Sequence, residues 1–312
     1  MLPLREDCGL IEWVPDTVAV RHVLMELQTR LNVGYTFADV RQMHQQVRLL
    51  LSPLLDCTAP WSDLDCWVVL QGAEIKDEAK LAKFELELFR KLLIMFPPIF
   101  HHWSLWRFPE PTQWFENRLV YARSVATWSM VGYLVGLGDR HAENILLDEK
   151  NGECVHVDYD CLFDKGATLE KPERVPFRLT SNIVDGFGVT GVNGTFRRSC
   201  EVALSVMRQN YETLMSVLES FIHDPLVEWK DKAATQRQIL STIEIRLKGV
   251  VSKETLPLSV QGQVHQLIAT ATSEQNLSRM YASASIVTAV AVDSRSLLCA
   301  VQRRYIGWMP WL

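Results

Sequence analysis

The chain has 312 residues, of which 48% are hydrophobic and 22% charged, and its formal net charge is −5. This composition is that of a globular protein with room for one large domain or two modest ones. The acidic balance excludes the basic face that nucleic-acid binding requires, so we expect no direct nucleic-acid contact. Seven scattered cysteines without CxxC spacing exclude a disulfide framework or a zinc site and fit a reducing compartment.

The N-terminal third contains a predicted strand and two predicted helices. The chain starts without the apolar region of a signal peptide. Residues 9–14 are expected to form a short strand, which Pro15 ends. A helix capped by Asp16 is expected over residues 16–31, because apolar residues recur there at helical spacing. Residues 33–75 are predicted to be irregular, and a second helix is expected over 77–95.

A predicted hairpin follows a long helix in the middle of the chain. The helix is expected over residues 114–137. Two short apolar runs then cover residues 144–148 and 154–158, and Asn151-Gly152 between them is a strong hairpin turn signal. A hairpin brings its two ends together, so the sequence predicts that the side chains at 144 and 158 lie side by side.

The rest of the chain is predicted to be mostly helical. A charged, proline-containing loop occupies residues 164–176, and helices are expected over 195–223, 233–248 and 258–272. The most apolar run, residues 284–301, contains Asp and Arg and is not expected to span a membrane. The predicted fold class is therefore α+β, mostly helical, with one small β-hairpin.

Three polar residues combine into a predicted catalytic site. Asp139 and Asn144 are five residues apart on one loop, and Asp158 lies at the end of the predicted hairpin. Phosphoryl transfer uses one carboxylate to accept the proton of the attacking hydroxyl, and an amide oxygen with a second carboxylate to hold magnesium. Each residue alone could be structural, but the combined spacing favours phosphoryl transfer.

The same loop carries a family resemblance. In ordinary protein kinases the catalytic loop has the sequence H-R-D-x-x-x-x-N, whereas this chain has Asp139-Arg140-His141-x-x-Asn144. This order resembles that of the phosphatidylinositol 3-kinase-related protein kinases. The resemblance implies a protein-kinase-like C-terminal lobe of the PI3/PI4-kinase type, with a catalytic loop at 136–146 and an activation segment at 158–180.

Flanking segments resemble the ATR branch of that family, which acts in DNA-damage checkpoints. They are residues 129–134, 156–163, 175–180 and 223–229, and the final residues 305–312 resemble the FATC tail. The resemblance implies a serine/threonine kinase that phosphorylates Ser/Thr-Gln sites in the nucleus, in checkpoint signalling and DNA repair. It also implies ATP and Mg²⁺, or Mn²⁺, as cofactors, and an ATR-interacting protein and activators as partners.

The resemblance assigns roles to the residues of the catalytic loop. Asp139 would be the catalytic base, and His141 would stabilise the transferred γ-phosphate. Asn144 and Asp158 would be the magnesium ligands.

It also assigns a nucleotide-binding surface. Trp13 would pack on adenine at the hinge between lobes, and the Val14 main chain would bond the edge of adenine. Leu146 and Val157 would form the floor of the adenine pocket.

The domain boundaries expected from the resemblance leave parts of the chain unexplained. Residues 1–14 would be the hinge and a remnant of a largely absent N-lobe, 15–272 the C-lobe, and 273–312 the FATC-like tail with a suspected insertion at 282–305. No lysine precedes Lys76, so the N-lobe lysine that binds ATP is missing. We expect a fragment that does not catalyse efficiently as written.

Two other functions stay open. Phosphoinositide lipid kinases share D-R-H-x-x-N, although the aromatic tail and the weakly basic activation segment argue against them. A catalytically inactive lobe could also act as a binding module. Residues 186–191 match G-x-G-x-x-G but follow the catalytic loop, so a turn is predicted there rather than a nucleotide site. Residues 57–76 receive no function.

Overall fold

The computed structural model describes residues 2–5, 8–33, 96–169, 172–223, 232–250 and 256–280, and the helical positions 82–83, 86–87, 89–90 and 93–94. The predictions for residues 33–75 beyond Val33, for 57–76, for the 282–305 insertion and for the 305–312 tail lie outside these residues.

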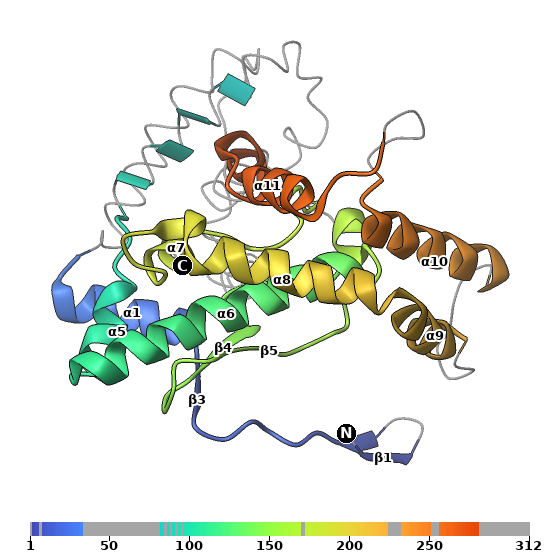
Figure 1. Ribbon diagram of the computed structural model, residues 1–312. Helices are drawn as coiled ribbons and strands as arrows, with labels where there is room; N and C mark the ends of the chain where they lie inside the picture. The colour runs from blue at the N-terminus through green and yellow to red at the C-terminus, as the bar shows by residue number, and fades with distance from the viewer. Residues whose placement is uncertain are drawn as a thin grey trace, which may run out of the picture.

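The first half of the chain forms the long helix α6, a three-stranded sheet beside it and a separate β1–β2 pair (Figure 1). Its elements are β1 (Leu2–Arg5), β2 (Cys8–Leu10), β3 (Thr17–Ala19), α1 (Val20–Leu31), α5 (His101–Arg107), α6 (Pro111–Val135), β4 (Ile145–Asp148) and β5 (Cys154–His156).

The second half is helical. Its elements are η2 (Lys165–Thr168), α7 (Ser181–Asp185), η3 (Gly191–Asn193), α8 (Thr195–Gln209), α9 (Tyr211–Ile222), α10 (Lys232–Lys248) and α11 (Val260–Ala271). The predicted fold class is confirmed, because the structure is mostly helical with a three-stranded sheet. Among the described residues, no helix combines the length and apolarity that crossing a bilayer would require.

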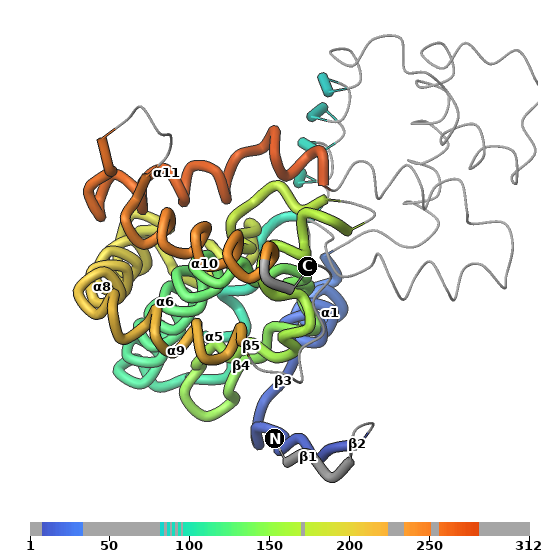
Figure 2. Tube along the Cα trace, turned by 90° about the vertical axis from the view of Figure 1, so that its right-hand side faces the viewer, coloured from blue at the N-terminus to red at the C-terminus, as the bar shows by residue number. Residues whose placement is uncertain are grey.

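Helix α6 is the centre of the fold. Its N-terminus is stabilised because Pro111 occupies the first turn and the Glu110 carboxylate accepts a hydrogen bond from the Gln113 N–H at 2.6 Å. It ends at Gly136, whose φ of 62° is the left-handed conformation that glycine adopts without strain. Helix α8 packs along α6, and Figures 1 and 2 show both running through the helical body.

The sheet β3–β4–β5 is antiparallel and has two unlike faces. Leu147 pairs with Val18 on β3 and with Cys154 on β5, and this face packs into the main core. Side chains alternate along a strand, so Leu146, paired with Ala19 and Val155, lies on the opposite face. Leu146 is nevertheless only 3% exposed.

The structure corrects the prediction for the N-terminal elements. The strand expected over 9–14 is confined to Cys8–Leu10, because β1 pairs only with those residues. The helix expected from Asp16 begins at Val20 instead. Asp16 has a φ of 54° and does not cap it, and residues 17–19 pair with β4 as a third strand. Pairing with a distant strand thus overrides the local helical pattern.

Two further boundaries differ from the prediction. The long helix begins at Pro111 rather than 114, because Glu110 caps it there. The single helix expected over 195–223 breaks at Asn210 into α8 and α9. The Asn210 side chain donates to the Val206 carbonyl at 2.8 Å, a local bond that competes with helix continuation. Strand β5 ends at His156, two residues before Asp158.

Candidate active site

Two loops meet beside the end of the sheet. The catalytic loop connects α6 to β4, and a second loop follows β5 and contains Asp158. The Val157 N–H donates to the Asn144 carbonyl at 3.1 Å, so the hairpin register continues into both loops. The Arg21 N–H at the start of α1 donates to the Ala142 carbonyl at 3.0 Å and fixes the catalytic loop from a third side.

Arg140 joins the two loops from inside. The residue is 3% exposed, and its guanidinium donates to the carbonyls of Gly138 at 2.9 Å and Val157 at 2.7 Å. It also donates to the Asp158 carbonyl. Burial lowers the pKa of the Arg140 guanidinium, although the charges of Asp139 and Asp158 raise it. Its bonds to main-chain oxygens make Arg140 a structural bridge rather than a phosphate ligand.

Asn144 is held with its amide in one orientation. The side chain is buried, and its Nδ2 donates to the Asp139 carbonyl at 3.0 Å. With the nitrogen engaged by the main chain, the amide oxygen is the atom that can approach a cation. The Asn144 side chain is therefore in direct contact with the Asp139 main chain.

Asp139 and Asp158 both have left-handed backbone conformations. Their φ angles are 55° and 61°. Residues other than glycine rarely adopt this conformation, and such strain concentrates at functional sites where the surroundings hold it. Here Arg140 bridges the two loops, and one Asp158 oxygen accepts from the Asp160 N–H at 3.2 Å.

His141 lies half-buried in the same loop. Its Nδ1 lies 3.2 Å from the Glu143 N–H, which donates to it, so the neutral ring carries its proton on Nε2. Burial lowers the pKa of the His141 imidazole, although the charges of Asp139 and Glu143 raise it. A neutral ring with Nε2–H available can donate one hydrogen bond to an anion.

The sheet face opposite the core is apolar, although Leu146 on it is only 3% exposed. Alternation along β5 places Val157 on the same face as Val155, and Val155 pairs with Leu146. Val157 is itself half-buried at the edge next to Asn144. The two residues predicted as a pocket floor therefore share one face.

Trp13 and Val14 lie at the other end of this sheet. Thr17 pairs with Asp148, and the Glu149 N–H donates to the Asp16 carbonyl at 2.9 Å. Four residues of strand separate that end from Asn144, or about 13 Å. Trp13 is 67% exposed and the Val14 carbonyl accepts from the Thr17 hydroxyl at 2.9 Å. These two residues are thus not brought together with the catalytic loop.

The oxygen donors present fit magnesium only in part. Asn144 and Asp158 offer an amide oxygen and a carboxylate, both hard ligands of the kind that Mg²⁺ prefers. Within the described part of the chain, no group of three or more His, Cys, Asp or Glu residues could hold a metal. This donor set fits an ion that takes its other ligands from phosphates and water.

The sequence prediction missed Glu173 beneath the catalytic loop. Its Oε1 accepts from the Asp139 N–H at 2.9 Å, and its own N–H donates to the Gly166 carbonyl at 3.0 Å. A glutamate in a charged loop is ordinarily solvated, so local sequence carried no signal for this contact.

A second missed feature supports β5. The His156 ring stacks on Trp128 of α6 with centroids 5.0 Å apart, and Trp128 also stacks on Tyr159. Burial lowers the pKa of His156 to about 3, so the ring stays neutral. The motif around Asp158 is therefore fixed against α6 by aromatic packing.

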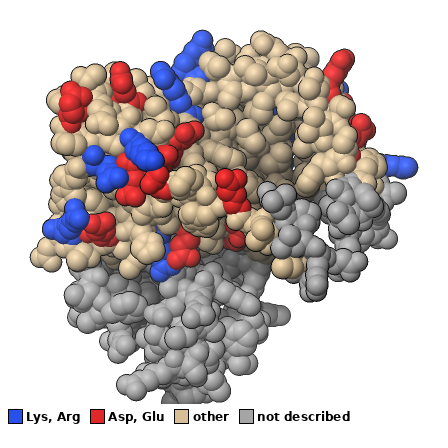
Figure 3. Space-filling model, turned by 90° about the horizontal axis from the view of Figure 1, so that it is seen from below, with Lys and Arg blue, Asp and Glu red and all other residues tan. Residues whose placement is uncertain are grey.

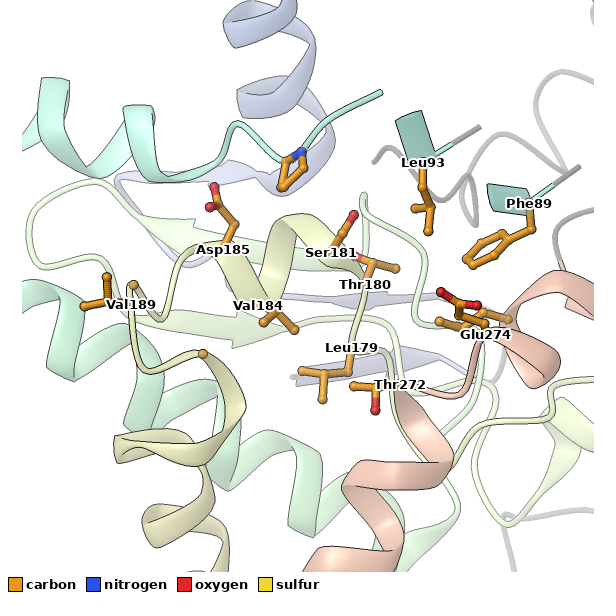
Figure 4. Close-up of a pocket in the computed structure, with 14 residues that line it drawn as sticks. Phe89, Leu93, Leu179, Thr180, Ser181, Val184, Asp185, Val189, Thr272 and Glu274 are labelled. Atoms are coloured by element: carbon orange, nitrogen blue, oxygen red, sulfur yellow. The ribbon is translucent and has the colours of Figure 1, made fainter. Parts of the chain in front are cut away.

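A separate cavity of about 480 Å³ lies at the end of the activation segment. Figure 4 shows Leu179, Thr180 and Ser181 lining it together with Thr272 and Glu274. None of the four predicted catalytic residues lines it. The short turn after α7 also borders this cavity, and it includes Gly188 and Gly191 of the G-x-G-x-x-G match.

The segment after α11 packs against the activation segment. Leu277 packs on Phe89 and Val175, and the Arg174 N–H lies 3.4 Å from the Met280 sulfur. Arg90 and Glu274 form an ion pair at 2.8 Å. The C-terminal described residues thus pack against residues 174 and 175 of the predicted activation segment.

Comparison with family models identifies two regions. The model described as phosphatidylinositol 3- and 4-kinase matches residues 1–231, and the FATC domain model matches residues 257–283. The second match begins before residue 273 and includes α11.

The chain is also similar to curated kinases and solved structures. It is 43% identical to the Arabidopsis thaliana protein "Serine/threonine-protein kinase ATR" over 99% of this chain and 10% of that protein. It is 42% identical to "Protein kinase rad3" of Schizosaccharomyces pombe over 90% of this chain and 11% of that protein. The solved "FAT and kinase domain of CtTel1" aligns with a TM-score of 0.69 and 32% identity, over 91% of this chain and 18% of that one. The chain spans about a tenth of the length of these curated relatives.

Proposed function

Because the chain belongs to the phosphatidylinositol 3- and 4-kinase family, we propose that it forms the catalytic C-lobe of an ATP-dependent serine/threonine protein kinase of the ATR type. Its reaction is transfer of the ATP γ-phosphate to Ser or Thr followed by Gln. Its setting is DNA-damage checkpoint signalling and repair in the nucleus. An ATR-interacting protein and activators are the partners that the likeness suggests.

One observation carries the proposal. Asn144 is oriented by the main chain of Asp139, and Arg140 bonds the loop of Asp158 to the same segment. The loops that carry Asp139, Asn144 and Asp158 are thus joined through their main chains. This supports a site in which two acids and an amide act together in phosphoryl transfer.

The proposed roles follow from these positions. Asp139 accepts the proton of the attacking hydroxyl, and His141 donates from Nε2 to the transferred phosphate. The Asn144 amide oxygen and the Asp158 carboxylate hold Mg²⁺, with Mn²⁺ as a substitute. The bound cation supplies charge neutralisation on the phosphates.

The sheet supports a direction for ATP. Leu146 and Val157 share an apolar sheet face next to the polar loops, and Val157 is the more exposed of the two. Trp13 and Val14 lie at the far end of the strands, where they can reach adenine while the phosphates lie at Asn144 and Asp158. We infer from these positions that ATP lies lengthwise along β4.

Protein rather than lipid substrates fit the charge distribution. An anionic membrane surface attracts clusters of Lys and Arg. The face seen in Figure 3 carries basic and acidic side chains intermixed among its described residues. A phosphoinositide kinase would need such a cluster near its activation segment.

The test is a phosphate-transfer assay of the full-length protein with a Ser-Gln peptide and, separately, phosphatidylinositol vesicles. We expect transfer to the peptide, and loss of that transfer in Asp139→Asn but not in Glu116→Gln on the exposed surface of α6. Transfer to lipid instead would make it a lipid kinase. Nucleotide binding without transfer to either would leave only a binding module.

A further inference from the structure

We propose that Glu173 is a positioning residue of this active site: from the activation segment, its carboxylate holds the main chain of the base Asp139 in its productive conformation. The inference rests on the proposed kinase function. It assigns a role to a residue outside the loops that carry the catalytic side chains.

The first support is a direct bond. Glu173 Oε1 accepts from the Asp139 N–H at 2.9 Å, and this N–H belongs to a residue with a φ of 55°. A residue in that left-handed conformation is not part of a helix or a strand, so its N–H needs a hydrogen-bond acceptor from elsewhere in the protein. The Asn144 side chain bonds the other end of the same residue, the Asp139 carbonyl. Asp139 is therefore clamped at both its N–H and its C=O.

The second support is a closely fitted site for the Glu173 side chain. A Cβ added at Gly138 would come within 2.6 Å of Glu173 Oε2 and 2.9 Å of the Gly166 Cα. A Cβ at Gly166 would likewise collide with the Glu173 carboxylate. One glycine before Asp139 and one in η2 thus leave room for this carboxylate, and a side chain at either position would displace it.

The charged surroundings make the carboxylate responsive to pH. Burial raises the pKa of Glu173 to about 7, and the negative charge of Asp139 raises it further. The hydrogen bond from the Asp139 N–H and the positive charges of Arg140 and Arg178 lower this pKa. The thiol of Cys161 also packs against Gly138. An ionised acceptor bonds an amide more strongly than a neutral one, so the clamp tightens as Glu173 ionises.

The position of Glu173 in the chain gives the clamp a consequence. Glu173 lies within the segment proposed to present the substrate, and its N–H donates to the Gly166 carbonyl at 3.0 Å. Displacement of this segment would withdraw the partner of the Asp139 N–H. The position of the activation segment therefore determines, through one hydrogen bond, whether the Asp139 main chain is held in place.

The test compares Glu173→Ala and Glu173→Gln with Glu116→Ala in the full-length kinase. kcat, the KM values for ATP and a Ser-Gln peptide, and the stoichiometry of ATP binding are measured between pH 6 and 8.5. We expect Glu173→Ala to lower kcat per ATP-binding molecule by about tenfold to a hundredfold, with the KM for ATP nearly unchanged, since small misplacement of a catalytic group has effects of this size. Glu173→Gln, which keeps an acceptor oxygen, should have an intermediate kcat and lack the wild-type rise in kcat near pH 7.

The outcomes separate this inference from the proposed function. Unchanged kcat in Glu173→Ala overturns the inference, as does a loss that only follows the fraction of ATP-binding molecules. A pH profile of Glu173→Gln identical to that of the wild type also overturns it. If Asp139→Asn, assayed in parallel, keeps wild-type kcat, the proposed function itself fails.

Discussion

Arg140 donates to the main-chain oxygen of Val157 at 2.7 Å, from a loop that precedes Val157 by a complete hairpin. The same guanidinium bonds the carbonyls of Gly138 and Asp158. One buried side chain therefore sets the distance between the loop of the proposed base and the loop of the proposed metal ligand. This relationship explains why the arginine lies between the acid and the histidine of the motif.

Replacing Arg140 should separate the two loops. Arg140→Lys keeps the charge but loses the planar fork, so two of the three carbonyls lose their donor. We expect a loss of roughly 3 kcal/mol in the free energy of unfolding, since bonds to charged groups contribute about 1.5–3 kcal/mol each. Urea denaturation of the chain measures it. Arg198→Lys, at an exposed position of α8, is the matched control, and equal midpoints for the two variants would contradict the bridging role.

Removing the proposed base should stop the chemistry without unfolding the protein. Asp139→Asn keeps the shape of the side chain and the main-chain bonds, but it cannot accept a proton. In the full-length kinase we expect kcat to fall by about 10²–10⁴-fold, the usual contribution of a general base. Circular dichroism and the thermal midpoint should match the wild type. A mutant with wild-type turnover would remove Asp139 from the mechanism.

The glycine before the base should tolerate no side chain. Gly138→Ala would place its Cβ 2.9 Å from the Gly166 Cα, where the backbone must move. Gly132 within α6 is the matched control, because the nearest atom to its added Cβ lies 3.7 Å away. Gly132→Ala should be neutral or stabilise by up to about 1 kcal/mol, since alanine favours helix. We expect thermal melting to show a lower midpoint only for Gly138→Ala, and similar midpoints would argue against the close packing.

Glu173 should make stability depend on pH. Its pKa is raised from an ordinary value of 4.5 to about 7, so the folded state binds more protons between these values. Stability from this group is fully present below about pH 4.5 and is lost as the pH rises through 7. The shift corresponds to on the order of 3 kcal/mol. Relative to wild type, Glu173→Gln should therefore gain stability between pH 5 and pH 8.

Chemical denaturation at several pH values measures this gain. Glu116→Gln, on the exposed side of α6, should follow the wild type at every pH. A difference between Glu173→Gln and wild type that stays constant from pH 5 to pH 8 would show that Glu173 does not ionise in this range.

The sequence by itself determined the parts that local chemistry encodes. Asn151-Gly152 predicted the turn of the β4–β5 hairpin, and the structure has that hairpin. The spacing of Asp139, Asn144 and Asp158 further predicted that their side chains meet, and this stays a prediction. The structure joins the two loops that carry them through Arg140. The helical periodicity of α6, α10 and α11 was equally local, and these helices lie close to their expected bounds.

Only the tertiary structure decided which distant groups complete the site. Residues 17–19 form a strand because β4, far along the chain, offers them partners, although their own pattern favoured a helix. The burial of Arg140 and the reach of Glu173 to the Asp139 amide likewise depend on chain segments that meet only after folding. The local periodicity of the sequence indicates which side of a helix or strand is apolar. It does not record which remote carbonyl, amide or glycine will lie opposite a charged side chain, and those contacts hold this site together.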